Sequence, residues 1–329
     1  KMMYPLQRNR RLRSSSSLRN LVREFEIYPK DFIVPLFIVE GENIKEEIPS
    51  MPGYYRMSLD LIEKEVALLW ELGLQSVLLF VKVSDTRKDN KGTEALNPEG
   101  LMQRAIQTVK RKVPEMVVMT DVALDPYSSY GHDGIVEEGI IVNDATVEVL
   151  SQMAVSHAEA GADIVAPSDM MDGRILSIRK GLEAAQLVDV GIMSYGAKYA
   201  SSFYGPFREA LDSAPGFGNK KTYQMDFGNR FDAVVECQRD LDEGADIIMV
   251  KPGIAYLDIL HELKQKLHCP LAVYQVSGEY AMLKAAAEKG FVNYELVMLE
   301  QLMAFKRAGA TLIASYHAKE VALFLNNEA

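Results

Sequence analysis

The sequence predicts an α/β protein folded as a (β/α)8 TIM barrel with an extended N-terminal arm. From about residue 32 onward, short β-branched runs alternate with amphipathic helical patterns, and this alternation is typical of βα units. Eight rounds of the alternation fit in roughly 300 residues, which is the size of a closed barrel. No Gly-rich phosphate loop follows the first predicted strand, where an open doubly wound sheet would usually have one. The closed barrel is therefore the better interpretation.

The predicted strands are eight apolar runs of strand length. They cover residues 32–40, 76–83, 116–124, 163–169, 191–199, 246–253, 270–277 and 311–317. Amphipathic patterns between the strands predict helices, among them residues 59–72, 144–160, 231–243, 256–267 and 294–308. A Gly-Ala pair precedes three of the strands, at Gly161, Gly244 and Gly309, and this recurrence indicates repeated βα units.

Residues 1–30 lie outside the repeat and predict an arm, which leaves residues 31–329 for the barrel. A short helix is expected at residues 18–26. Its apolar positions at helical spacing are Leu18, Leu21, Val22 and Phe25. Together with the basic run at residues 8–13, these positions favour docking of the arm on an acidic neighbouring subunit. A second irregular stretch, residues 201–229, holds four Gly and two Pro and predicts a lid at the catalytic face.

The composition of the 329 residues excludes several classes of protein. The net charge of -10 argues against a general nucleic-acid binder. No apolar stretch reaches the roughly 18 residues that a membrane span needs. Residues 1–13 are basic but have no apolar core, so no secretory signal is predicted, and a processed upstream segment stays open. Cys237 and Cys269 make neither a disulfide framework nor a CxxC clip, which suits a reducing cytoplasm.

Lys198 and Lys251 are the most informative residues, because each ends an apolar run that reads as a buried parallel strand. The carboxyl end of such a strand is where α/β enzymes do chemistry. Burial disfavours the charged form of a lysine, and a second ammonium nearby disfavours it again. Two lysines in one pocket would therefore leave at least one free amine, which can form an imine, or Schiff base, with a carbonyl substrate. The alternative interpretation is that each lysine extends its charged end from a strand end into solvent. This interpretation fits one such lysine more readily than two.

Four segments together resemble one known family. They are residues 121–127 (DVALDPY), 166–173 (APSDMMDG), 193–208 (from MSY to FYGPFR) and 249–253 (MVKPG). They look like the porphobilinogen synthase family, also called 5-aminolevulinate dehydratases, and the resemblance extends from the basic arm to Tyr316. It implies a barrel with an N-terminal arm, usually a homo-octamer. Its members are lyases that condense two molecules of 5-aminolevulinate to porphobilinogen with loss of two waters, early in tetrapyrrole (haem and chlorophyll) biosynthesis.

The resemblance also implies roles for individual residues. Lys251 is expected to form the imine with the first substrate, and Lys198 with the second. The residues expected to bind the substrate carboxylates are Ser277 and Tyr316 for the first substrate, and Arg208, Lys220 and Gln224 for the second. Hydroxyl donors and a guanidinium suit that task. Lys220 departs from the pattern, because many members have an arginine there, and a point charge should orient a carboxylate less well.

An acidic cluster is the more informative departure from the family. Zinc-dependent members carry cysteines at the positions of Ala123, Asp125 and Asp133, so no thiolate zinc site is expected here. Aspartates are hard oxygen ligands that suit Mg²⁺, a monovalent ion or the ammonium group of the substrate. The residues expected to orient the second substrate and move protons are Asp121, Asp125, Asp133, Ser168 and Asp169. Loop capping by clustered Asp is the alternative interpretation.

Glu236 matches the residue that anchors a stimulatory, allosteric Mg²⁺ at a subunit interface in the magnesium-type members, whereas sequence alone shows a helix-surface Glu. Mg²⁺ is thus the expected metal, and no organic cofactor is expected.

Two other functions stay open. A class I aldolase would explain Lys251 and the fold but not Lys198, and it would usually need a phosphate site. A non-catalytic scaffold derived from the barrel would tolerate loss of the key residues, and only Lys220 departs from its expected type.

Overall fold

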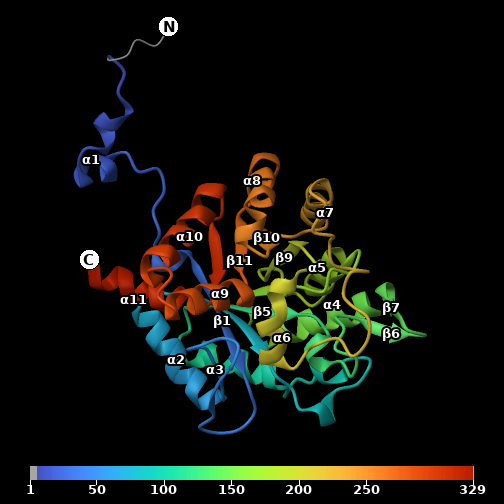
Figure 1. Ribbon diagram of the computed structural model, residues 1–329. Coiled ribbons are helices and arrows are strands. Elements are labelled where there is room, and N and C mark those ends of the chain that lie inside the picture. Colours follow the sequence, from blue (N-terminus) through green and yellow to red (C-terminus); the bar gives the residue numbers. More distant parts are fainter. Residues whose placement is uncertain (1–5, 329) are drawn as a thin grey trace.

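Eight parallel strands form the closed barrel that the sequence predicts. The computed structural model describes residues 6–328. The barrel strands are β1 (Phe32–Ile38), β4 (Ser76–Val81), β5 (Val117–Val122), β8 (Ile164–Pro167), β9 (Gly191–Lys198), β10 (Ile247–Lys251), β11 (Leu271–Gln275) and β12 (Leu312–Ser315). Each lies within its predicted range. They pair in this order, and β12 returns to β1 with Phe32 opposite Ile313 and Ile33 opposite Ala314, which closes the barrel (Figure 1).

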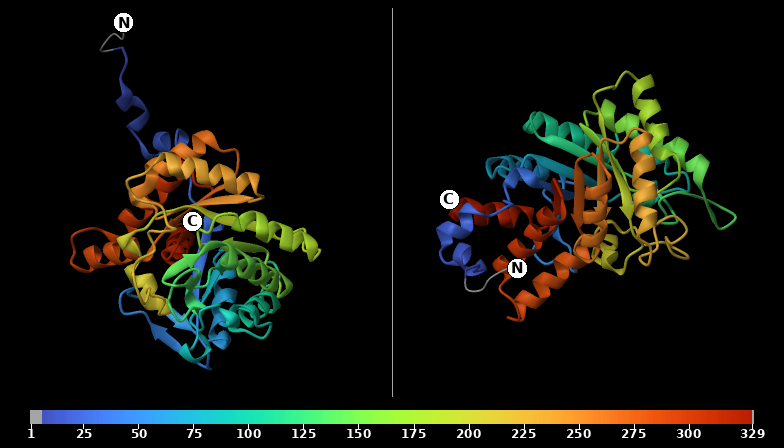
Figure 2. Two further views of the ribbon diagram at one scale, coloured as in Figure 1. Left: turned by 90° about the vertical axis from the view of Figure 1, so that its right-hand side faces the viewer. Right: turned by 90° about the horizontal axis from the view of Figure 1, so that it is seen from above.

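Helices surround the barrel (Figure 2). They are α2 (Leu59–Glu71), α3 (Leu101–Lys112), α4 (Asn143–Glu159), α5 (Arg174–Ala184), α6 (Gly205–Leu211), α7 (Phe231–Asp242), α8 (Leu257–Lys266), α9 (Ser277–Glu288), α10 (Tyr294–Ala308) and α11 (Ala318–Glu328). The five helices predicted by range are confirmed to within one residue at each end. Among residues 6–328, no helix is both long and apolar enough to cross a bilayer.

Two short hairpins interrupt the βα repeat, and sequence patterns missed both. One joins β2 (Lys45–Glu47) to β3 (Tyr55–Met57), and the other joins β6 (Ile135–Glu137) to β7 (Ile140–Val142). Each strand has three residues, which is too short for a period-2 pattern to stand out. The second hairpin follows β5 and so lies on the same side of the barrel as the predicted acidic cluster.

The core has two layers, as expected for strands whose side chains alternate between two faces. One set of buried residues, including Ile33 and Phe37 of β1, fills the barrel interior with Tyr195, Tyr274 and other aromatics. The alternate residues of the same strand, such as Val34, pack outward with the helices. Tyr195 of β9 and Tyr274 of β11 belong to this interior set, and the two lysines end β9 and β10.

The arm contains a short 3-10 helix (Asn9–Arg13) followed by α1 (Ser16–Leu21), and it extends away from the barrel (Figure 1). Residues 1–5 of the predicted arm lie outside the described residues. The expected helix at 18–26 was partly wrong: Ser15 accepts a hydrogen bond from the backbone of Leu18 and starts the helix earlier, and the helix ends at Leu21. A short helix without packing partners is marginal, and none of the α1 residues is buried, with Leu21 79% exposed.

The predicted lid, residues 201–229, is not wholly irregular. It contains α6, which begins at Gly205 with Pro206 in its first turn, a position that proline tolerates. Asp212 ends the helix in the left-handed region, with φ 52°. Gly205 and Pro206, which contributed to the loop prediction, therefore mark the start of a short helix.

Candidate active site

Lys198 and Lys251 end adjacent barrel strands and are opposite each other in the β9–β10 ladder. Equivalent register in a parallel pair puts both side chains on the same face of the sheet. Both lysines are buried, with 6% and 5% of their surface exposed. The structure therefore brings the two predicted imine lysines together at the carboxyl end of the barrel.

The Lys251 ammonium lies in a cage of aromatic rings. Its Nζ is 4.5–5.3 Å from the ring centroids of Tyr195, Tyr204, Phe207 and Tyr274. Burial, followed by the charge on Lys198, lowers the pKa of Lys251 to about 7. Ring faces stabilise a cation only weakly compared with a carboxylate. The lowered pKa therefore makes the uncharged, nucleophilic amine more accessible at neutral pH than it is for an ordinary lysine.

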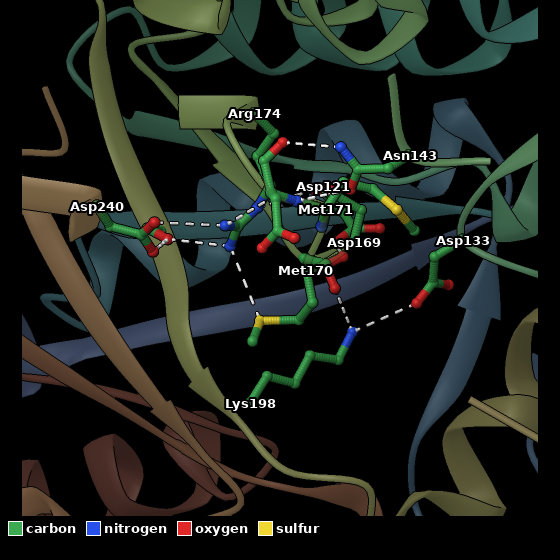
Figure 3. A network of polar contacts seen from close by, with 12 residues as sticks. Asp121, Asp133, Asn143, Asp169, Met170, Met171, Arg174, Lys198 and Asp240 are labelled. Atoms are coloured by element: carbon green, nitrogen blue, oxygen red, sulfur yellow. Dashed lines mark hydrogen bonds and ion pairs between the residues drawn. The ribbon is translucent and has the colours of Figure 1, made fainter. Parts of the chain in front are cut away.

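Lys198 has polar neighbours instead. Its Nζ donates a hydrogen bond to the backbone carbonyl of Ser168 and lies 3.9 Å from Oδ2 of Asp133. The ring of Tyr195 is 5.6 Å away, so the two lysines share one aromatic neighbour. The contacts with Ser168 and Asp133 fix the direction of the Lys198 side chain (Figure 3).

Asp121, at the end of β5, lies beside the lysines. Burial and the neighbouring Asp125 raise the pKa of Asp121 to about 7, while a 2.6 Å hydrogen bond from the Ser168 hydroxyl opposes the increase. A carboxyl group with a pKa near neutrality can both accept and donate a proton. Burial also raises the pKa of Asp125, against the effect of Lys220.

Asp133 is held between two ammonium groups. Its Oδ1 is 2.8 Å from Nζ of Lys220, and its Oδ2 faces Lys198. Burial alone would raise the pKa of Asp133, but Lys220 and Lys198 lower it below its ordinary value. Lys220 also lies 3.4 Å from Asp125. The pKa of Lys220, which burial alone would lower, is raised by these two aspartates.

Asp169 faces away from these aspartates, toward a buried arginine. Its Oδ1 is 3.3 Å from Nε of Arg174, and its Oδ2 accepts a hydrogen bond from the backbone of Met171 (Figure 3). Burial raises the pKa of Asp169 to about 6, and Arg174 opposes the increase. Asp169 thus holds the turn after Ser168, so its assigned role toward the substrate stays a prediction.

Glu236, the expected Mg²⁺ anchor, belongs to the same arginine network. Its Oε1 lies 3.7 Å from Arg174, whose guanidinium also meets Asp240 at 3.4 Å. Burial and Asp240 raise the pKa of Glu236 to about 7. One guanidinium therefore faces three carboxylates, those of Asp169, Glu236 and Asp240. Within residues 6–328, no group of three or more His, Cys, Asp and Glu side chains is placed to hold a metal.

The two residues predicted to bind the first carboxylate lie on the Lys251 side of the site. Ser277 is buried at the start of α9, and its Oγ accepts a hydrogen bond of 2.9 Å from the backbone of Phe207. Tyr316 follows β12, and its hydroxyl lies 2.9 Å from that of Tyr274, one of the rings around Lys251. Two hydroxyl groups thus flank the cage.

The residues predicted for the second carboxylate are spread over the lid. Arg208 lies half-buried on α6, and its positive charge acts to lower the pKa of Lys220. Gln224 is buried, and its Oε1 has no hydrogen-bond partner within the described chain. Lys220 contacts Asp125 and Asp133, so a substrate carboxylate would share this lysine with the aspartates.

Sequence reasoning missed two sets of residues. The aromatic cage comes from separate segments, and only its contact with Lys251 reveals it. Glu279 is the other: it is buried and accepts backbone hydrogen bonds from Gly253 and Ile254, after Lys251, and from Val276. Burial raises the pKa of Glu279 to about 7. A Glu in the first turn of the helix after the strand at 270–277 is a capping signal that could have found it.

Comparison with known proteins gives one consistent result. The Delta-aminolevulinic acid dehydratase family profile matches residues 6–324. The chain is 49% identical over 324 residues to the Delta-aminolevulinic acid dehydratase of Bacillus subtilis, covering 98% of this chain and 99% of that protein. It is 53% identical over 328 residues to the chloroplastic enzyme of Glycine max, covering 98% of this chain and 79% of that protein.

A solved structure gives the same answer. Delta-aminolevulinic acid dehydratase from Toxoplasma gondii, in complex with the reaction product porphobilinogen, superposes with a TM-score of 0.97 at 48% identity. The match covers 99% of this chain and 94% of that chain. The family resemblance predicted from the sequence is confirmed: the chain belongs to the Delta-aminolevulinic acid dehydratase (porphobilinogen synthase) family.

Proposed function

We propose that this chain is a porphobilinogen synthase that condenses two molecules of 5-aminolevulinate through imines on Lys251 and Lys198. The observation that supports this most directly is the pairing of two buried lysines on adjacent strands, one with a pKa of about 7. Two ketones must lose their oxygens in the reaction, and each lysine removes one of them as water.

The chemistry follows from the two imines. Each lysine attacks a substrate ketone, forms a C=N bond and releases one water. The imine acidifies the neighbouring carbon, so that one substrate can form a C–C bond to the other. The amino group of one substrate then attacks the remaining imine carbon, closes the ring and displaces the lysine. The carbon attacked in C–C bond formation still carries its lysine, and loss of a proton from the neighbouring carbon breaks that C–N bond, forms a C=C bond and releases this lysine as an amine. Loss of a further proton completes the aromatic pyrrole, with both lysines returned as amines.

The aspartates and Ser168 act on protons and on the substrate amino group. Asp121, with a pKa of about 7, takes and returns protons beside the lysines. Asp133 and Asp125 offer negative charge to an ammonium, as they do to Lys220. The Ser168 hydroxyl holds the Asp121 carboxylate, and its carbonyl holds Lys198.

Carboxylate recognition separates the two substrates. Ser277 and Tyr316 bind the first carboxylate, next to the Lys251 cage. Arg208, Lys220 and Gln224 of the lid bind the second, so the lid organises the second substrate. The hydroxyl, amide and cationic groups are all hydrogen-bond donors for a carboxylate.

The metal requirement is that of a magnesium-type enzyme. Ala123, Asp125 and Asp133 offer no thiolate for zinc. Glu236 would hold Mg²⁺, which would supply positive charge beside the carboxylates around Arg174. Its effect is allosteric, because Glu236 lies on α7 outside the pair of lysines.

Assembly and location complete the proposal. The exposed apolar residues of the arm dock on a second copy, and the assembly is an octamer. Residues 201–229 act as the lid. Both cysteines are free, which fits a reducing cytoplasm.

Incubation with 5-aminolevulinate, followed by a colorimetric test for porphobilinogen, measures the proposed reaction. Borohydride reduction during turnover should fix the substrate to Lys251, and to Lys198 when the second site is filled, because reduction converts an imine to a stable amine. Lys251→Met should eliminate turnover, and Lys198→Met should nearly do so. An adduct on neither lysine, or substantial turnover by Lys251→Met, would show that the double-imine mechanism is wrong.

A further inference from the structure

His132 joins the lid to the catalytic aspartates through a chain of hydrogen bonds. Its Nε2 lies 3.0 Å from the backbone carbonyl of Phe217, and its Nδ1 lies 3.0 Å from the hydroxyl of Tyr223. The same Tyr223 hydroxyl accepts a hydrogen bond of 3.4 Å from the backbone N–H of Asp133. Phe217 and Tyr223 both belong to the lid, residues 201–229. His132 is 1% exposed, so water does not compete for these bonds.

The partners determine the direction of each hydrogen bond. A carbonyl can only accept, so Nε2 of His132 carries a proton and donates it to Phe217. Nδ1 then acts as the acceptor for the Tyr223 hydroxyl. The Tyr223 oxygen keeps a lone pair for the N–H of Asp133. In this arrangement, every hydrogen-bond donor faces an acceptor. The four groups are the Phe217 carbonyl, the His132 ring, the Tyr223 hydroxyl and the Asp133 N–H.

This series of hydrogen bonds ends at the backbone N–H of Asp133. The side chain of Asp133 contacts both Lys198 and the lid. The carboxylate of Asp133 faces Lys198 at 3.9 Å and Lys220 at 2.8 Å. Lys220 lies in the same lid segment as Phe217 and Tyr223. The lid thus contacts Asp133 in two ways. Lys220 forms an ion pair with its carboxylate, and the Tyr223 hydroxyl, which also bonds His132, accepts a hydrogen bond from its backbone N–H.

Ring packing also holds the loop of His132 against the lid. The His132 ring lies 4.8 Å from the Phe217 ring, and Tyr130 meets Phe217 edge-on at 5.7 Å. Gly131, between them, has φ 65°, and a Cβ there would come within 2.2 Å of the Ala214 carbonyl. The lid backbone therefore lies directly on the loop that holds His132.

We propose that His132 and Tyr223 are positioning residues that latch lid residues 217–223 onto Asp133. The latch sets Lys220 at the second-substrate site and fixes the backbone of the aspartate beside Lys198. The proposal rests on the proposed function for its effect on turnover, but the latch itself can be measured in the protein without substrate.

Removal of the bridging hydroxyl tests the latch. Tyr223→Phe should raise the hydrogen-exchange rates of the amides at 213–224 by about threefold to tenfold, as expected for one lost hydrogen bond. His132→Gln should have a similar effect. The effect of the double variant should be smaller than the sum of the two single effects, because both changes remove the same His132–Tyr223 hydrogen bond. In turnover, the KM for 5-aminolevulinate should rise more than kcat falls.

Tyr130→Phe is the matched control. Tyr130 lies on the same loop, is 41% exposed and keeps its ring contact with Phe217, while the structure gives its hydroxyl no hydrogen bond within residues 6–328. Hydrogen exchange of the lid amides and KM should therefore match the parent protein.

Unchanged hydrogen exchange of the lid in Tyr223→Phe, or additive effects of the two latch variants, would overturn the proposal even if the parent protein makes porphobilinogen. A parent protein that makes none would instead refute the proposed function, and lid exchange would still decide the latch. If His132→Gln does not fold, Tyr223→Phe alone decides it.

Discussion

Lys198 and Lys251 are direct partners across the β9–β10 ladder, so two amines leave the barrel wall on the same face and at the same level. Their surroundings nevertheless differ. Lys251 has aromatic rings around its Nζ, whereas Lys198 has a carbonyl and a carboxylate. Within residues 6–328, Lys251 forms no ion pair with a carboxylate, whereas Lys198 lies 3.9 Å from Oδ2 of Asp133.

Imine formation on Lys251 should follow the ionisation of this residue. Burial and the charge on Lys198 lower its pKa to about 7, below the ordinary value for lysine. The free amine therefore increases as pH rises through 7, and borohydride trapping of 5-aminolevulinate on Lys251 should increase about tenfold between pH 6 and pH 8. Peptide mapping of trapped protein over that range measures the effect.

Lys198→Met provides the control for this pH profile. It removes one of the two causes of the lowered pKa, so the rise in Lys251 labelling should move to higher pH. Labelling that is independent of pH between 6 and 8, or that falls as pH increases, would contradict the assignment of Lys251 as the amine that attacks first.

The parts of the site that could be predicted from sequence are those where a local pattern reports the three-dimensional position. An apolar run that ends in a lysine places that lysine at a strand end, as confirmed for Lys198 and Lys251. Aromatic cages and networks such as that of Arg174 bring together residues from several segments, and no local pattern reports this. Arg174, for example, is 1% exposed and contacts three carboxylates, those of Asp169, Glu236 and Asp240.

The fold was predictable for the same reason. Eight repeated patterns determine a closed barrel once each strand is recognised, because parallel strands joined by helices bury both faces. The exceptions were segments whose structure depends on contacts with other elements or chains. The arm helix, for example, is shorter than its apolar pattern predicted, and none of its residues is buried.

Glu279→Gln should weaken both the fold and the first-substrate site. Glu279 accepts three backbone N–H groups with two oxygens, and they join the loop after Lys251 to the start of α9. Gln keeps one acceptor oxygen and places an N–H against other N–H groups, so the free energy of unfolding should fall by roughly 1–3 kcal/mol. Denaturant titration measures this, and trapping on Lys251 should slow. A variant with parental stability would show that the loop does not depend on Glu279.

Activity should not require zinc. The positions that bind zinc in other members are Ala123, Asp125 and Asp133, and here Lys220 lies between the two aspartates as a cation. A zinc-specific chelator should therefore leave porphobilinogen formation intact, whereas EDTA should remove any stimulation by Mg²⁺. Loss of activity with the zinc chelator, restored by zinc alone, would contradict the proposal.

Glu236→Ala should abolish stimulation by Mg²⁺, because it removes the half-buried carboxylate at the edge of the Arg174 network. The measurement is the ratio of turnover with Mg²⁺ to turnover without it, which should fall to about one. Asp232→Ala is the matched control, since it removes an exposed carboxylate from the same helix and should keep the parental ratio. A normal ratio in Glu236→Ala would leave this residue as a structural partner of Arg174.

Deletion of the arm should reduce the size of the assembly without unfolding the barrel. The cut belongs after residue 24, because Ile27 is buried and Asp31 forms a 3.1 Å ion pair with Lys306. Upstream of that point, Leu12, Leu21 and Val22 expose apolar surface that a second copy would cover. Light scattering should show a smaller particle, while circular dichroism and the melting temperature of the barrel should change little. An unchanged particle would mean that other surfaces hold the subunits together.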